Sequence, residues 1–237
     1  MTFAGPSDLN QTSPGSGDSE PKNDSWILNV THASTLFSKF SAGLGTLTSL
    51  KHLRIFAGGM DTSDYASDGK FALSWIEKLS NTEDTNFIGK TMVLFHSVPL
   101  MPPGVNNRKR HVGNDVVHII FCEDPSINFH GNNFGTQIIS GEFCFVTIFV
   151  VPMCENSIVS VTLKLKDDLD EKVKDQLEHL VGSTVMPFDT SPTFVRQLAM
   201  RADLACRSVF QDRLGLFSNW QERMQQIHSL KRYQSSY

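Results

Sequence analysis

The stretch R-K-R-H-V-G-N-D-V-V-H-I-I-F, from Arg108 to Phe121, places three cations, a histidine and a G-N-D turn directly before an apolar run. That run, Val116–Phe121, is interrupted only by His118 and predicts a buried strand. A strand in the core holds the preceding turn rigidly, so that polar side chains there are presented in a defined position. The cations beside the turn favour an anionic partner surface, such as a nucleotide phosphate or acidic loops.

Further strand patterns lie on both sides of this run in the sequence. Phe143–Val151 is apolar throughout, which is typical of a central strand with both faces covered. Val159–Leu165 alternates apolar and polar residues, which predicts a half-buried strand nearer an edge of the sheet. Shorter strands are expected earlier in the chain, at Arg54–Ala57, Phe71–Ile76 and Met92–Val98.

Four segments carry apolar residues at helical spacing. The first covers residues 35–50, although Gly43 and Gly45 weaken its middle. The second follows a predicted N-cap at Asp168, with Glu171 at the spacing of a capping box. The other two are expected over Pro192–Phe210 and from about Ser218 onward.

Together these elements predict an α/β fold, with a mixed central sheet flanked by helices. Residues 1–24 are rich in Ser, Gly, Pro, Asp and Asn, and we expect them to be a disordered tail or linker. Residues 25–237 are expected to form one domain, for which 40% hydrophobic residues provide a sizeable core.

Composition and motifs exclude several classes of function. A net charge of -4 argues against a general nucleic-acid binder, and the longest apolar run, Phe143–Cys154, is too short for a transmembrane helix. The four cysteines show no CxxC pair, which suits a reducing compartment, and we expect a cytoplasmic protein. The sequence has no G-x-S-x-G elbow, H-E-x-x-H, P-loop or dinucleotide fingerprint, and its histidines lack metal-ligand spacing. We therefore expect no metal and no cofactor of its own.

The motif R-K-R-H-x-G-N-D before an apolar strand resembles the signature of the Rap-GAP family. The resemblance is closer to the tuberin branch than to the Rap-specific or Ral-specific branches, and it covers roughly residues 30–235. Flanking blocks agree in order and spacing: F-S-K-F-S-A-G-L-G from Phe37, G-G-M-D from Gly58, D-G-x-F from Asp68, L-M-P from Leu100, E-F-x-F-V from Glu142, F-V-R-Q-L-A from Phe194 and S-x-W from Ser218.

This resemblance implies a GTPase activator, and not an enzyme with a substrate of its own. In the family, the asparagine equivalent to Asn114 acts as a thumb that enters the nucleotide site of a Ras-like GTPase. There its carboxamide orients the attacking water. The supporting or GTPase-contacting residues that the resemblance implies are His111, Lys109, Arg110, Arg108 and Asp115.

The same resemblance implies the partners. The GTPase expected for the tuberin branch is Rheb, and GTP and Mg²⁺ belong to that GTPase. Hamartin is the expected partner of a full-length protein, which would act at the lysosomal or vacuolar surface. An alternative is a module that binds a GTPase or a scaffold without accelerating hydrolysis, but the intact Asn114 favours an activator.

Several polar residues have simpler explanations. The G-N-D segment alone would be an ordinary turn, and the basic run before it a solvated loop. His118 is predicted to be a hydrogen-bonded core histidine, and Asp61–Asp68 a loop without calcium-site spacing. The helix after Pro192 is predicted to place Arg196, Arg201 and Arg207 on its solvated face, and Cys122, Cys144 and Cys206 are predicted to pack in the core.

Overall fold

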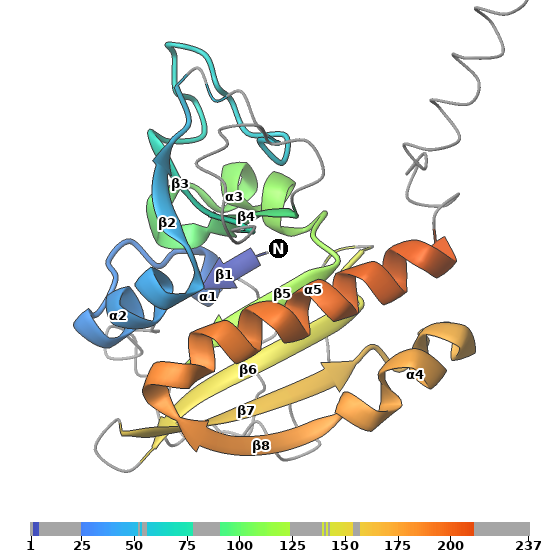
Figure 1. Cartoon of the computed structure of the whole chain (residues 1–237). Coiled ribbons are helices and arrows are strands. Elements are labelled where there is room, and N and C mark those ends of the chain that lie inside the picture. The colour runs from blue at the N-terminus through green and yellow to red at the C-terminus, as the bar shows by residue number, and fades with distance from the viewer. Residues whose placement is uncertain are drawn as a thin grey trace, which may run out of the picture.

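Eight strands form one mixed sheet in the computed structural model, which describes residues 2–4, 25–51, 53, 56–77, 91–123, 139, 141, 143–153 and 157–210. Their order across the sheet is β2-β3-β4-β1-β5-β6-β7-β8 (Figure 1). The four strands β4, β1, β5 and β6 run parallel to their neighbours within this group, and the outer pairs are antiparallel. The strands are β1 (Thr2–Ala4), β2 (Thr46–Ser49), β3 (Phe71–Ile76), β4 (Met92–Ser97), β5 (Val117–Phe121), β6 (Val146–Met153), β7 (Ile158–Leu165) and β8 (Gly182–Pro187).

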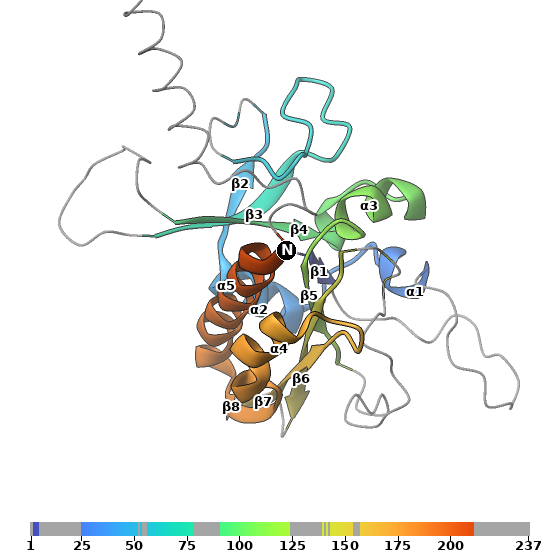
Figure 2. The ribbon, with the colours of Figure 1, turned by 90° about the vertical axis from the view of Figure 1, so that its right-hand side faces the viewer.

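Helices cover both faces of this sheet (Figures 1 and 2). On one face α2, α4 and α5 pack side by side, and on the other α1 lies next to α3. The mixed α/β architecture predicted from the sequence is therefore confirmed. The helices are α1 (Ser25–Leu28), α2 (Thr35–Leu44), α3 (Val105–Val112), α4 (Glu171–Leu177) and α5 (Ser191–Phe210), with 3-10 turns η2 (Val98–Leu100), η4 (Glu178–Leu180) and η5 (Phe188–Thr190).

The two most apolar predicted strands lie near the centre of the sheet with both faces covered. β5 and β6 pair in parallel, with Val117 opposite Val146. Alternate residues of β5 point to opposite faces, so that Ile119 joins the core beneath α5 and Ile120 the core beneath α3. Two apolar layers explain the unbroken runs, although β6 begins at Val146 and not at Phe143.

Strand β7 is not the half-buried strand that its alternating pattern predicted. It lies between β6 and β8, and its polar residues Ser160 and Thr162 are buried as well. Thr162 Oγ1 forms a 2.8 Å hydrogen bond with Ser183 Oγ of β8, which satisfies both hydroxyls. The edge is instead β8, whose short polar sequence was not predicted as a strand and whose Val185 is exposed.

The predicted tail over residues 1–24 is wrong at Thr2–Ala4. These residues form β1, which lies parallel to β4 and β5, with Thr2 opposite His96 on one side and His118 on the other. Such pairing uses backbone hydrogen bonds and needs no apolar pattern, so composition alone does not reveal it. Residues 5–24 lie outside the described part of the chain, and the assignment of a tail there stays a prediction.

The helix predicted over residues 35–50 ends after its first ten residues. The backbone N–H of Gly45 closes α2 by donating to the carbonyl oxygen of Ser41 over 3.1 Å. The chain then enters β2, where two β-branched threonines suit an antiparallel pair with β3. The glycines that weakened the pattern therefore mark a real boundary.

Helix α5 confirms the helix predicted over Pro192–Phe210, but Arg196 is not on its solvated face. The Arg196 side chain is buried, and its Nη1 donates to the carbonyl oxygens of Gly43 and Leu44 over 2.8 and 2.7 Å. Its guanidinium also lies 4.7 Å from the centre of the Trp75 ring. Because the last carbonyls of α2 need donors, Arg196 ties α2 to α5.

Helix α4 starts after Asp170, and the predicted N-cap at Asp168 is wrong. Asp170 Oδ1 accepts from the backbone N–H of Lys172 over 2.9 Å, which is the cap interaction. Asp168 instead pairs with Lys166 at 3.3 Å.

Two predicted elements lie wholly or partly outside the described residues. The helix expected from Ser218 falls within 211–237, and of Arg54–Ala57 the structure describes Phe56 and Ala57, which are not in a strand. Among the residues that the structure does describe, no helix has the length and apolar character needed to span a membrane.

Candidate functional site

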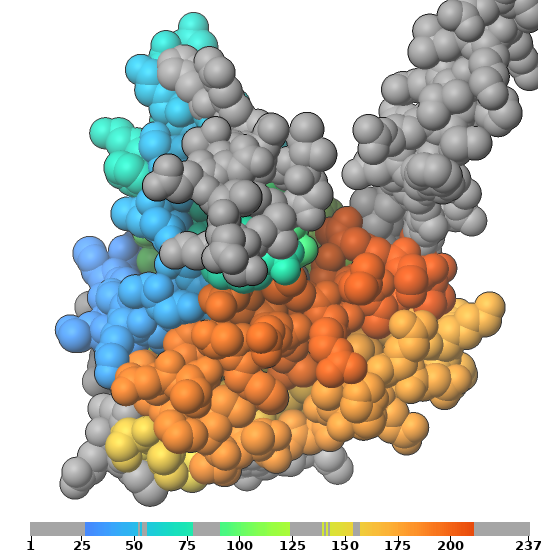
Figure 3. All heavy atoms as spheres, in the orientation of Figure 1, coloured from blue at the N-terminus to red at the C-terminus, as the bar shows by residue number. Residues whose placement is uncertain are grey.

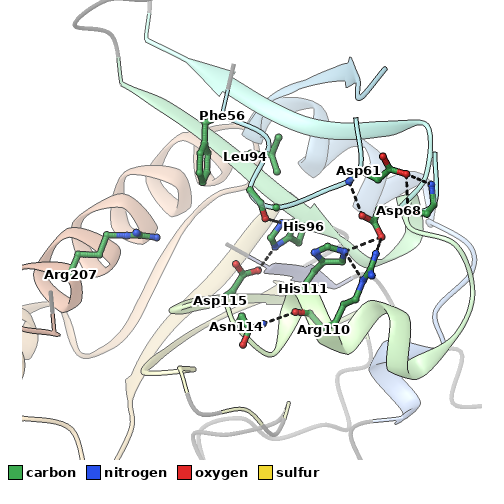
Figure 4. Close-up of a pocket in the computed structure, with 13 residues that line it drawn as sticks. Phe56, Asp61, Asp68, Leu94, His96, Arg110, His111, Asn114, Asp115 and Arg207 are labelled. Carbon is green, nitrogen blue, oxygen red and sulfur yellow. Dashed lines mark hydrogen bonds and ion pairs between the residues drawn. The ribbon is translucent and has the colours of Figure 1, made fainter. Parts of the chain in front are cut away.

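The basic motif lies in helix α3, not in the solvated loop that the basic run alone predicted (Figure 4). The helix follows Gly104, whose φ of 130° is open to glycine, and its last turn carries Lys109, Arg110 and His111. Cations at this end are favourable because the carbonyl groups there carry partial negative charge.

The C-terminal end of α3 is fully hydrogen-bonded by the turn that follows it. The last four carbonyl oxygens of a helix have no partner within the helix, and each finds one here. The carbonyl oxygen of Lys109 accepts from the Gly113 amide (2.7 Å), that of Arg110 from Asn114 Nδ2 (2.7 Å), that of His111 from the Asn114 amide (3.1 Å) and that of Val112 from the Asp115 amide (3.1 Å).

Asn114 is exposed and has a fixed carboxamide. Its Nδ2 is held by the Arg110 carbonyl, while its Oδ1 points away from the helix (Figure 4). Within the described residues, Oδ1 has no hydrogen-bond partner. The site therefore presents one oriented acceptor to solvent.

Asn114 stands on the rim of a cleft of about 640 Å³. The cleft lies between the glycine turn at residues 58–59, strand β4, the end of α3 and helix α5 (Figure 4). Four predicted site residues line it: Arg110, His111, Asn114 and Asp115. It also contains side chains that sequence analysis missed, chiefly Asp61, Asp68, His96 and Arg207.

Asp68 holds the basic motif in place through its carboxylate, although the sequence predicted only a loop around it. This buried carboxylate accepts from Arg110 Nη2, lies 3.0 Å from His111 Nε2 and accepts from the Asp61 amide over 2.7 Å. Burial by itself raises the pKa of Asp68, but the hydrogen bonds from His111, the Asp61 amide and Arg110 outweigh it and lower that pKa. The ionised Asp68 thus fixes the orientation of Arg110 and His111.

His96 links Asp115, in the turn after α3, to the glycine turn at residues 58–59. Its Nδ1 lies 2.8 Å from Asp115 Oδ2 and its Nε2 lies 3.1 Å from the carbonyl oxygen of Gly58. Gly58 has a φ of 62°, and a Cβ there would lie 2.9 Å from His96 Nε2, so both its backbone and its close packing require glycine. The rings of His96 and His111 also pack together, with centroids 5.3 Å apart.

Arg108 does not face a partner, although the resemblance grouped it with the supporting or GTPase-contacting residues. It is 1% exposed, and its guanidinium donates four hydrogen bonds to backbone carbonyls. Its position inside the protein makes it a support for the site and not a contact. The acceptors are Pro102 (2.9 Å), Leu28 and Val30 (2.7 Å each) and Met101 (2.8 Å).

The other predicted residues take simpler positions. Lys109 is half-buried on α3 and does not line the cleft. His118 is a core histidine, as predicted, and hydrogen-bonds the Val112 carbonyl over 2.9 Å. Burial raises the pKa of Cys206 to about 12, which suits a packing role. Cys122 and Cys144 are buried too. The described residues contain no group of three or more His, Cys, Asp or Glu side chains that could hold a metal ion.

Comparisons with known proteins agree in family and fold. The Rap/ran-GAP family model matches residues 27–229. The Tuberous sclerosis 2 protein homolog of Schizosaccharomyces pombe is 29% identical over 226 residues, which cover 89% of this chain and 15% of that protein. The Ral GTPase-activating protein subunit alpha-1 of Homo sapiens is 27% identical over 202 residues, which cover 83% of this chain and 8% of that protein. The chain thus spans a small part of these curated relatives.

A solved structure of the TSC2 GAP domain has the same fold. It superposes with a TM-score of 0.59 at 24% identity, over 78% of this chain and 90% of that chain. The matched region includes most of the residues that the structure describes, and it spans nearly all of the solved domain.

Proposed function

The chain belongs to the Rap/ran-GAP family, and from that membership we propose that it is a GTPase-activating domain that completes the active site of a Ras-like small GTPase. The observation that carries the proposal is Asn114, with Nδ2 held by the Arg110 carbonyl and Oδ1 exposed on the rim of the cleft. The name of the human relative, a subunit of a Ral GTPase-activating protein, supports this class of function.

Asn114 has the chemistry of a water-orienting group. Phosphoryl transfer needs chiefly an aligned nucleophile and compensated charge, and Oδ1 can accept a proton of the attacking water. Because Nδ2 is already bound at 2.7 Å, the orientation of the carboxamide is fixed before the GTPase binds. GTP and Mg²⁺ would come with the partner.

Charges in the cleft favour action in trans over a nucleotide site in this chain. Arg110 pairs with Asp68, and Arg207 donates to Asp203 Oδ2 over 2.5 Å. Each of these cations is therefore compensated by a carboxylate of its own. A phosphate-binding pocket would instead present uncompensated donors, so the cleft is better suited to hold the thumb than to hold GTP.

An apolar groove next to the thumb offers a docking surface for the GTPase. The groove, of about 630 Å³, lies between β4 and α5 and shares Phe56, Leu94 and Arg207 with the cleft. Phe56 and Leu204 are 61% and 69% exposed, and α5 lies open along this face of the molecule (Figure 3). We assign this groove to the GTPase because it is continuous with the cleft that Asn114 borders.

Rheb is the proposed substrate, from the resemblance to the tuberin branch, and Ral is the second candidate, from the name of the human relative. Both are Ras-like, and specificity resides in contacts spread over the interface. Hamartin binding and action at the lysosomal or vacuolar surface stay predictions for a longer protein.

Single-turnover GTP hydrolysis by Rheb, Ral and Rap, each with the chain and with Asn114→Ala, tests the proposal. We expect acceleration of one GTPase that falls by roughly two orders of magnitude or more in the variant. Asn106→Ala is the matched control, because Asn106 is exposed on the same helix but does not line the cleft. A variant as active as the parent chain would exclude the thumb, and binding without acceleration would leave the silent module.

A further inference from the structure

A buried histidine–cysteine pair lies directly beneath the turn that carries Asn114. His118 comes from β5 and Cys144 from the segment before β6, and both side chains are fully buried. Cys144 Sγ lies 3.1 Å from His118 Nδ1, and His118 Nε2 lies 2.9 Å from the carbonyl oxygen of Val112. Both ring nitrogens therefore have a partner.

The contact with Val112 fixes which nitrogen of His118 carries a proton. A carbonyl oxygen can only accept, so Nε2 carries hydrogen and donates it. Burial lowers the pKa of His118, but the Cys144 side chain, the Asp115 carboxylate and the Val112 carbonyl outweigh burial and raise it. A thiol S–H can donate to Nδ1, so the contact with Cys144 agrees with a proton on Nε2.

The carbonyl that His118 bonds lies at the end of the helix that precedes Asn114. Val112 is the last residue of α3, two positions before Asn114, and its carbonyl also accepts from the amide of Asp115. The Val112 carbonyl oxygen thus receives hydrogen bonds both from His118 in the core and from Asp115 on the far side of the turn. From another side, Gly141 packs so closely that a Cβ there would lie 2.3 Å from the Gly113 carbonyl oxygen.

We propose that His118 is a positioning residue for Asn114, and that Cys144 fixes the His118 ring for this task. The proposal rests on the proposed function, and it assigns to a core histidine an effect on the rate of hydrolysis in the partner. A displacement of about 1 Å in a positioning group can change a rate by 10²-fold, so a loosened turn lowers the rate without loss of the fold.

Substitutions with opposite chemistry separate positioning from packing. His118→Leu removes the donor to Val112, whereas His118→Gln places an amide N–H near the position of Nε2. Cys144→Ala removes the partner of Nδ1, whereas Cys144→Ser keeps a hydroxyl there. Thr162→Val is the matched control, because it deletes a partly buried hydroxyl hydrogen bond between β7 and β8, outside the turn.

The first readout is amide hydrogen exchange, which needs no GTPase. We expect the Asp115 amide, which donates to Val112, to exchange at least tenfold faster in His118→Leu and in Cys144→Ala. The Gln and Ser variants and Thr162→Val should leave that exchange near the value of the parent chain. Unchanged exchange in both His118→Leu and Cys144→Ala would overturn the proposal. If His118→Leu does not fold, the comparison of Cys144→Ala with Cys144→Ser decides.

The second readout is single-turnover hydrolysis at varied concentrations of the chain. We expect His118→Leu to lower the maximal rate by roughly 10- to 100-fold with little change in the half-saturating concentration, because the groove on α5 is untouched. Partial rescue in His118→Gln supports positioning. A loss confined to the half-saturating concentration, or equal loss in Thr162→Val, would contradict it. If the parent chain accelerates no GTPase, the proposed function fails while the exchange result still decides the positioning.

Discussion

Asn114 Nδ2 donates to the carbonyl oxygen of Arg110 over 2.7 Å, so the side chain that we propose acts on a partner GTPase also caps the helix that precedes it. One hydrogen bond thereby serves the stability of α3 and the orientation of Oδ1. A substitution at this position should consequently affect both properties, and the two can be measured separately.

Asn114→Asp is expected to lower stability and abolish activation. A carboxylate cannot donate to the Arg110 carbonyl, and it adds negative charge at the negative end of the helix, which should lower the free energy of unfolding by about 1 kcal/mol. The same charge would repel the γ-phosphate of GTP. Urea unfolding and single-turnover hydrolysis measure the two effects. Asn106→Asp, in the first turn of α3 where an anion is favourable, should be at least as stable as the parent chain and fully active.

Leu204→Ser should weaken docking and leave chemistry intact. Leu204 is 69% exposed in the groove beside the cleft, and its loss is expected to raise the half-saturating concentration about tenfold, or roughly 1.4 kcal/mol. The maximal rate should change little, because Asn114 is unaffected. Val185→Ser on the edge strand β8 is the control, since Val185 is similarly exposed but lies outside the groove. Equal effects of the two substitutions would remove the groove from the interface.

Asp68→Asn should make the free energy of unfolding depend less on pH in the acid range. In the folded protein the pKa of Asp68 lies below its usual value of 3.8. The contribution of Asp68 to the free energy of unfolding is therefore fully present above pH 3.8. The contribution is lost as the pH falls from there through the lower folded pKa. At pH 7 we expect the variant to be less stable by roughly 1–3 kcal/mol, and the difference to shrink below about pH 4.

Urea unfolding between pH 3 and pH 7 tests this dependence. Asp64→Asn is the control, because Asp64 pairs with Lys51 on the surface and such pairs contribute little. A difference between Asp68→Asn and the parent chain that stays constant over this range would show that Asp68 is not held ionised by its partners.

Arg108→Lys should destabilise the domain by roughly 3 kcal/mol or more. The guanidinium reaches four carbonyl oxygens from three nitrogens, and an ammonium group cannot occupy those positions together. Thermal unfolding measures the loss, and Arg201→Lys on the exposed face of α5 should show almost none. If Arg108→Lys is as stable as the parent chain but has a raised half-saturating concentration, Arg108 acts at the GTPase interface instead.

Local patterns predicted the central strands, helix α5 and the position of the motif before β5. They succeed there because burial on both faces requires continuous apolar residues, and burial on one side of a helix requires a repeat near 3.6. The patterns failed where the determining contact is not local. Thr162 of β7 bonds the Ser183 side chain of β8, and Arg196 is buried because it reaches the end of α2.

The sequence by itself determined the family, the type of fold and the candidate thumb at Asn114, since these depend on residue identity and spacing along the chain. Only the tertiary structure decided how the site is held. Asp68 meets Arg110 across 42 residues and His96 meets Asp115 across 19, and no periodicity relates such partners. Hydrogen bonds between side chains depend on distances of about 3 Å that exist only after the strands and helices have packed. For that reason the sequence left Arg108 as a supporting or GTPase-contacting residue, and only the folded chain places it in the core and brings His96 and Asp68 into the site.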